Sequence, residues 1–273
     1  MEIFIMHIRG FIKASLFVLD DNIGVPIATG WGRLMATGIR PPAFIGAYPD
    51  FETAKAHAPS GNPNTYDNDD VAPLNFALMS KVHIWDYPVV FWLGRVLGPN
   101  SHVLDIGGHF GTKYIAFRDL LSLSDVTWNV HDLPAIIRAA RAAQQQGDVP
   151  AEVKFIDEVA AGAGADVLLA SGLLQYLDQP FAKLVSSLPM QPKTILLNKV
   201  ATREGPTVVT LERIGPARLP YQIRNRAEFE GELATMGYAI RDCWEIPSLA
   251  RIIGTHPGLG PSKSLGYYLE YVG

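Results

Sequence analysis

The stretch from Val103 to Gly111, which reads Val-Leu-Asp-Ile-Gly-Gly-His-Phe-Gly, constrains the fold of this chain more than any other segment. Residues 103–106 have the apolar character of a short buried strand, closely spaced glycines follow, and a helical pattern runs from Thr112 to Leu121. A strand that enters a helix through a glycine turn directs backbone N–H groups and the positive end of the helix to one point. The stretch therefore predicts a cofactor-binding turn, and a tight turn without a ligand is the alternative.

The glycine spacing differs from that of the dinucleotide-binding fingerprint. G-x-G-x-x-G starting at Gly107 requires glycines at 109 and 112, where this chain has His109 and Thr112. The pattern D-x-G-x-x-x-G resembles instead the first motif of the class I S-adenosylmethionine-dependent methyltransferases, an acid followed by a glycine-rich turn. The resemblance implies that the cofactor is S-adenosylmethionine and that it is bound by Asp105, Gly107, Gly108 and Gly111.

The composition sets limits on the kind of protein this is. A chain of 273 residues with 48% hydrophobic and 18% charged residues can fold as one large α/β domain with an appendage. Its formal net charge of -4 offers no global basic surface, which argues against nucleic acid as a partner. A single cysteine, Cys243, excludes an internal disulfide, so a cytoplasmic location is expected.

The first 73 residues are expected to form an N-terminal arm or cap, and residues 74–273 the main domain. Residues 3–19 are apolar but contain His7, Arg9 and Lys13, so we expect this run to pack on the body or on a second copy in a homodimer and not to insert stably into a membrane. Glu2 and the lack of a small-residue cleavage pattern argue against a signal peptide. Residues 20–70 are rich in Gly and Pro, with aromatic residues between them, and fit either a layer over a pocket or an extended wrapping arm.

The remainder of the chain alternates between strand and helix patterns, which is typical of a doubly wound parallel sheet. Residues 74–97 have a helical pattern that we expect Pro88 to break or kink at Tyr87. The predicted strands are 126–130, 153–156, 166–170, 194–199, 238–246 and 265–272, and the predicted helical segments are 133–146, 174–188 and 226–236. Together with residues 103–106 they match the seven-stranded order of the class I methyltransferases, so the expected fold is Rossmann-like with an N-terminal cap.

The acid at the end of the second predicted strand is the next candidate for the cofactor site. Asp132 can accept hydrogen bonds from both ribose hydroxyls of an adenosine cofactor, and it also suits the N-cap of the following helix. The triplet Asp132-Leu133-Pro134 resembles the small-molecule O-methyltransferases. This resemblance implies that Asp157 lies near the adenine and that Ser171 and Gly172 border the methionine end.

The general base is harder to predict. Many O-methyltransferases have a histidine just after the fourth strand, but this chain has Gln175 there, and a neutral amide cannot take up a proton. His109 and His256 are the remaining candidates for catalysis, each with a plain structural alternative as a turn or loop residue. His83 and Tyr87 are candidates for substrate contact, and no spacing of histidines and acids indicates a metal site.

A basic segment follows the fifth predicted strand. Residues 201–226, expected to be an inserted hairpin, contain Arg203 and Arg224, which are candidates for holding an anionic acceptor; a solvated hairpin is the alternative. Phe44–Tyr48 and Tyr66-Asp67 also resemble a little-characterised bacterial family of methyltransferase-like proteins. The sequence thus predicts a methyltransferase that acts on a small molecule, more readily at oxygen than at nitrogen. A non-catalytic protein that binds S-adenosylmethionine and a nicotinamide-dependent oxidoreductase remain as alternatives.

Overall fold

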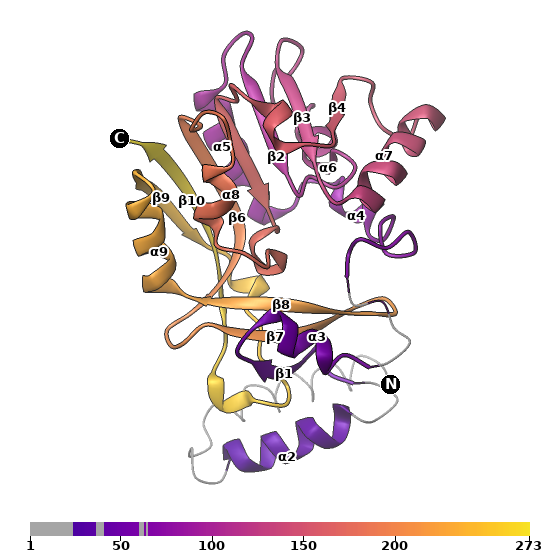
Figure 1. Ribbon diagram of the computed structural model, residues 1–273, viewed down its shortest axis with the longest axis vertical. Helices are drawn as coiled ribbons and strands as arrows, with labels where there is room; N and C mark the ends of the chain where they lie inside the picture. Colours follow the sequence, from indigo (N-terminus) through magenta and orange to yellow (C-terminus); the bar gives the residue numbers. More distant parts are fainter. Residues whose placement is uncertain (1–23, 37–40, 60–62, 64) are drawn as a thin grey trace.

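A computed structural model describes residues 24–36, 41–59, 63 and 65–273. Its centre is a large twisted sheet with helices on both faces, and a long hairpin crosses beneath that sheet (Figure 1). The apolar run at residues 3–19 and its expected role in a dimer lie outside the described residues. No helix in the described ranges is long and apolar enough to cross a membrane.

Seven strands form the Rossmann-like part of the sheet, in the order β4-β3-β2-β5-β6-β10-β9. Parallel ladders join β2 to β3 and β5, β3 to β4, and β5 to β6, whereas β10 runs antiparallel to β6 and β9. Their bounds are β2 His102–Ile106, β3 Thr127–His131, β4 Val153–Ile156, β5 Val167–Ser171, β6 Thr194–Arg203, β9 Tyr238–Glu245 and β10 Lys263–Tyr271. The seven strands and the order expected from the sequence are confirmed.

Each face of this sheet has its own hydrophobic core, because successive residues of a strand point to opposite faces. Val103 packs on one side with α5 Tyr87–Val96, α6 Thr112–Phe117 and α7 Pro134–Gln146. Leu104 packs on the other with α8 Phe181–Ser186 and α9 Arg226–Thr235. The unbroken apolar sequence of β5 follows from this arrangement, since both of its faces are covered.

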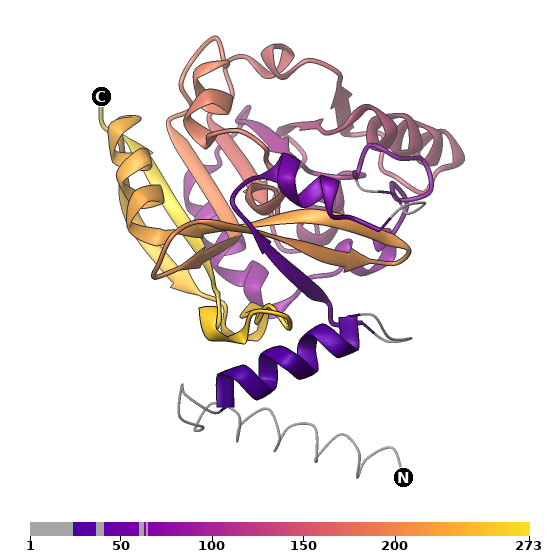
Figure 2. The same cartoon turned by 60° about the horizontal axis from the view of Figure 1, so that its bottom comes forward.

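Three further strands extend the sheet. The hairpin of β7 Val208–Ile214 and β8 Ala217–Asn225 confirms the one expected after the fifth strand, and β1 Phe44–Tyr48 adds an antiparallel edge to β7. The hairpin joins the main sheet through only Thr202 and Arg203 of β6, which pair in parallel with Arg224 and Asn225. Helix α3 Phe51–Ala56 lies against the hairpin, and α2 Gly24–Ala36 lies beyond β1 (Figure 2).

Three helix predictions differ in detail from the structure. Residues 74–97 divide into α4 Phe76–Met79, the short 3₁₀ turn η1 Ile84–Asp86 and α5; the break expected at Tyr87 coincides with the first residue of α5, and the helical pattern is also interrupted between α4 and η1. Pro88 lies in the first turn of α5, where the N–H that proline lacks would have no helical acceptor. Similarly, residues 174–188 divide into the turn η3 Leu174–Tyr176 and α8, which begins after Pro180. Helix α6 ends at Phe117, four residues before the expected Leu121.

Candidate functional site

The glycine turn lies at the carboxyl end of β2, where the strand order of the sheet reverses. β2 is the first strand of the parallel set and has β3 on one side and β5 on the other, so the connections diverge beside it. Ligands of open α/β sheets bind at such switch points. Gly107 and Gly111 have φ values of +71° and +72°, which side chains rarely tolerate, and a Cβ at Gly111 would lie 2.8 Å from Val153.

Asp105 is fully buried beneath this turn. Its Oδ2 accepts a hydrogen bond of 3.2 Å from the indole of Trp128, and a Cβ at Gly108 would lie 2.6 Å from its carboxyl carbon. Burial raises the pKa of Asp105 to about 7, while the Trp128 hydrogen bond and the charge of Lys113 act in the opposite direction. Gly108 is therefore glycine because the carboxyl group occupies the space of a side chain.

Asp132 follows β3 and reaches back to the glycine turn. Its Oδ2 accepts a 2.8 Å hydrogen bond from the N–H of His109, and its Oδ1 accepts one of 2.7 Å from the N–H of Leu133. The expectation that Asp132 is the N-cap was wrong, because Leu133 occupies that position and Asp67 accepts the hydrogen bond of the Ala135 N–H at 2.8 Å. Burial raises the pKa of Asp132 to about 6, which leaves the carboxylate ionised at neutral pH with acceptor capacity to spare.

His109 is held inside the turn by the segment that precedes η1. It has a φ of +55°, stacks on Phe110, and lies parallel to Phe76 at 6.4 Å between ring centroids. Burial lowers the pKa of His109 to about 4, against a hydrogen bond with the Ala72 backbone. The ring is therefore neutral at pH 7, and its buried Nδ1 has no hydrogen-bond partner among the described residues.

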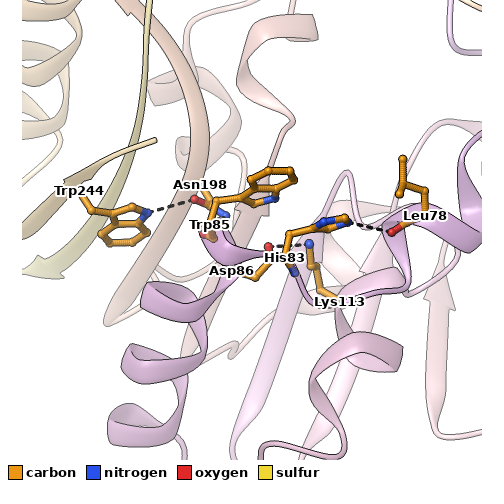
Figure 3. A network of polar contacts seen from close by, with 7 residues as sticks. All are labelled: Leu78, His83, Trp85, Asp86, Lys113, Asn198 and Trp244. Atoms are coloured by element: carbon orange, nitrogen blue, oxygen red, sulfur yellow. Dashed lines mark hydrogen bonds and ion pairs between the residues drawn. The ribbon is translucent and has the colours of Figure 1, made fainter. Parts of the chain in front are cut away.

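A buried ion pair ties η1 to the helix that follows the glycine turn (Figure 3). Lys113 Nζ lies 2.7 Å from Asp86 Oδ1, and the two side chains are 5% and 0% exposed. The second oxygen of Asp86 accepts a hydrogen bond from the His83 N–H, and the His83 ring stacks on Trp85. These contacts fix η1 against the carboxyl edge of the sheet.

The same figure shows how η1 is joined to the next strands. Asn198 of β6 donates a 3.1 Å hydrogen bond to the Trp85 carbonyl and accepts one of 3.2 Å from the indole of Trp244 (Figure 3). Ser171 and Gln175 are both buried at the end of β5 and just beyond it. Among the described residues, no partner exists for buried polar atoms on His109, Ser171, Gln175 and the Trp85 indole. Since buried polar groups are normally hydrogen-bonded, this gathering around the strand ends indicates a site for a polar ligand.

The other residues predicted for the site do not all lie at the glycine turn. Asp157 is exposed and forms a two-pronged ion pair with Arg141, with N–O distances of 2.9 and 2.8 Å. His256 hydrogen-bonds with Thr255, whose hydroxyl also accepts the Gly46 N–H, so this loop lies against β1 and not at the glycine turn. The His83 ring hydrogen-bonds with the Leu78 carbonyl, and Tyr87 is 58% exposed.

The two candidate arginines differ in their surroundings. Arg203 donates to the carbonyls of Pro206 and Leu259, at 2.7 and 3.0 Å. Arg224 is buried, its Nη1 has no partner in the described part of the chain, and burial lowers its pKa to about 10. It lines a cavity of about 390 Å³ that is also bordered by the carboxylates of Asp50, Asp178, Glu228 and Glu232.

Comparisons with known proteins give no sequence relative. No protein-family model matches the chain, and no curated protein matches it. Among solved structures, 1,6-didemethyltoxoflavin-N1-methyltransferase of Burkholderia thailandensis, bound to its substrate and S-adenosylhomocysteine, is 19% identical with a TM-score of 0.44, over 80% of this chain and 97% of that one.

Two other solved structures have similarly low sequence identities and TM-scores. An S-adenosylmethionine-dependent methyltransferase of Clostridium acetobutylicum is 10% identical, with a TM-score of 0.46 over 77% of this chain and all of that chain. A LepI variant in complex with S-adenosylhomocysteine and a substrate analogue is 14% identical, with a TM-score of 0.46 over 74% of this chain. This chain spans about half of the LepI chain, 52%. Likenesses at this level carry no argument about function.

The sequence did not indicate the buried pair of Asp86 and Lys113, or that the amine of Lys199 in β6 lies beside Gly172, just after β5. The signals that were present are an acid within the apolar run Ile84-Trp85-Asp86 and a lysine in the first turn after the glycines. Neither signal identifies its partner, which comes from a distant part of the chain. The strand order, with the glycine turn at its switch point, gives this chain the Rossmann-like fold that class I methyltransferases have.

Proposed function

We propose that this protein is an S-adenosylmethionine-dependent methyltransferase that acts on a small molecule, at a hydroxyl oxygen. The observation that carries the proposal is the placement of Asp132 beside the glycine turn at the switch point of the sheet. An acid on the second strand, one strand away from a glycine turn, is the arrangement that suits the two hydroxyls of a ribose.

The residues present fit such a cofactor. Positive φ at Gly107 and Gly111 keeps side chains out of the turn, and Asp132 retains free lone pairs beyond its two backbone hydrogen bonds. Unpartnered polar atoms on His109, Ser171 and Gln175 lie at the ends of the neighbouring strands. Asp157 fits an adenine contact less well, because it is already paired with Arg141.

The bound cofactor would supply an electrophilic methyl group, and the protein would supply alignment. Asp132 would hold the ribose, and the backbone of the glycine turn would approach the cofactor closely. We propose that residues 1–73 form a cap, since Asp67 hydrogen-bonds with the start of α7 and Ala72 with His109. Such a cover excludes water and fixes the acceptor in line with the methyl group.

The proposal that the acceptor is anionic rests on Arg224. A buried guanidinium with an unpartnered nitrogen is suited to a carboxylate or phosphate. The four acidic residues that border the same cavity oppose a highly charged anion, so we propose that the acceptor molecule carries, besides the hydroxyl that is methylated, no more than a single carboxylate.

Calorimetric titration of S-adenosylmethionine, S-adenosylhomocysteine and NAD into the wild type and Asp132→Asn tests the proposed cofactor. Asparagine keeps an oxygen for the His109 N–H but loses the charge, so we expect both adenosyl ligands to bind the variant at least about tenfold more weakly. Asp148→Ala, which changes the exposed acid just after α7, is the matched control.

Each outcome separates the remaining classes of protein. Heat from NAD alone would support a nicotinamide-dependent oxidoreductase, and no heat from any ligand with folded protein would return the glycine turn to a structural role. Tight binding of both adenosyl ligands, without methyl transfer to any phenol, hydroxy acid or amine tested, would support a non-catalytic binding protein.

A further inference from the structure

Lys199 lies where β6 passes the carboxyl end of β5. Asn198 is paired with Ser171, the last residue of β5, so Lys199 is the next residue beyond that ladder. The register between β6 and β10 shifts here, with Val200 opposite Leu265 and Leu197 opposite Tyr267. Lys199 has a φ of +61°, a conformation that lysine rarely adopts. A bulge of this kind redirects a side chain out of the regular alternation.

The redirected side chain lies against Gly172. A Cβ at Gly172 would be 3.2 Å from both Cε and Nζ of Lys199 and 3.7 Å from Nε2 of Gln175. Because Gly172 has no side chain, the amine of Lys199 has space there. It lies next to Gln175, which occupies the position where many O-methyltransferases have a histidine. In the described part of the chain, no group hydrogen-bonds with Lys199 Nζ.

The charges around this amine come from three elements. Lys113 of α6 is cationic, and Asp86 of η1 and Asp105 of β2 are acids. Burial, together with the charge of Lys113, lowers the pKa of Lys199 to about 7, while the two acids act in the opposite direction. A large fraction of Lys199 is therefore a free amine at neutral pH, which is what a general base requires.

We propose that Lys199 is the general base of the methyl transfer, placed on the acceptor side of the site in the role that Gln175 cannot fill. The inference rests on the proposed function. The acceptor oxygen forms a bond to the methyl carbon as its proton passes to the lone pair of Lys199 Nζ. The carbon–sulfur bond breaks with both electrons going to sulfur, so the sulfonium becomes a neutral thioether and the amine becomes an ammonium.

This placement has a consequence that needs no acceptor. Protonated Lys199 repels the sulfonium of S-adenosylmethionine but not the thioether of S-adenosylhomocysteine, and the two ligands are otherwise alike. We therefore expect the Kd of S-adenosylmethionine divided by the Kd of S-adenosylhomocysteine to fall at least about tenfold between about pH 6 and pH 9. Calorimetry at several pH values measures this ratio, in which the titration of the shared ligand groups cancels.

Three variants complete the experiment. Lys199→Met should give a low ratio that changes much less with pH than that of the wild type, since only Asp105 and Asp132 then titrate at the site, and Lys199→Arg, which stays charged, a high one. Lys193→Met removes an exposed lysine just before the opposite end of β6 and should behave as wild type. Circular dichroism and unaltered binding of S-adenosylhomocysteine show that each variant is folded.

The outcomes distinguish this proposal from the one on which it rests. A wild type that binds both ligands with a ratio independent of pH overturns the placement of Lys199, whereas failure to bind either ligand refutes the proposed function. With an acceptor phenol that the wild type methylates, Lys199→Met should lose at least about a hundredfold in kcat. An unchanged kcat with intact cofactor binding would overturn the role as base.

Discussion

At the scale of single residues, the site contains ionisable groups whose pKa values the fold shifts far from their ordinary values. Asp105 and Lys199 are on neighbouring parts of the same edge, and burial moves the pKa of each to about 7. Such positions are costly for stability, since burial disfavours the charged form of each group. Clustering of perturbed groups in one region is typical of functional sites.

Replacing Asp105 by asparagine tests this cost. The folded pKa of about 7 lies above the unfolded value of about 3.9, so the native state binds the proton more tightly and loses stability as pH rises from about 4 to 7. We expect Asp105→Asn to be more stable than wild type by roughly 4 kcal/mol at pH 8 and by little at pH 4. Urea unfolding at both values measures the difference.

The asparagine variant should retain the hydrogen bond from the Trp128 indole, because its amide oxygen can accept it. Asp119→Asn, a substitution at an exposed acid after α6, should leave stability unchanged at both pH values. Equal stability of Asp105→Asn and wild type at pH 8 would mean that neighbouring groups offset the free-energy cost of burying the ionised carboxylate of Asp105.

At the scale of secondary-structure elements, the ion pair of Asp86 and Lys113 fastens η1 to α6. Both partners are almost completely buried, and Asp86 also receives the His83 N–H. Removing one partner would leave the other charge buried and unpaired. Such changes are strongly destabilising, whereas loss of an exposed pair costs little.

We expect Lys113→Met to lower the free energy of unfolding by about 3–5 kcal/mol. Asp86→Asn with Lys113→Met should restore part of the loss, because no charge is then left unpaired. Asp69→Ala, which breaks the exposed pair with Arg138, is the control and should cost less than about 1 kcal/mol. Chemical denaturation of the four proteins gives the values, and a loss in Lys113→Met as small as that of the control would contradict the expectation.

At the scale of the whole molecule, the elements that form the site come from separate parts of the chain between residues 67 and 199. The glycine turn, η1, the end of β5, the middle of β6 and the segment before α4 meet at one edge of the sheet. A ligand that joins these parts should stabilise the whole fold, because it binds the native state and not the unfolded chain.

We expect S-adenosylhomocysteine at a hundred times its Kd to stabilise the protein by about 2.7 kcal/mol, which raises Tm by roughly 5–10 °C. Differential scanning fluorimetry measures the shift. NAD at the same concentration should produce none, and Asp132→Asn should show a smaller shift at the same concentration of S-adenosylhomocysteine. An equal shift in wild type and Asp132→Asn would place the ligand away from Asp132.

The sequence by itself determined the fold class and the glycine turn. Apolar strands separated by amphipathic helices specify a parallel sheet, and Gly107 and Gly111 occur where only positive φ is compatible with the turn. These features are local, since periodicity and backbone conformation are encoded by neighbouring residues. The break expected at Tyr87 is also local, because Pro88 suits the first turn of α5, which begins at Tyr87.

Only the tertiary structure decided which distant groups meet. Nothing near Asp86 in the sequence indicates Lys113, and nothing near Gly172 indicates that the amine of Lys199 fills its space. Likewise, the N–H of Ala135 at the start of α7 donates to Asp67, which is distant in sequence, and not to Asp132, the neighbouring acid from which this cap was expected. Burial and partner choice depend on strand order and on a bulge between β6 and β10, and these are properties of the assembled sheet, not of any one segment.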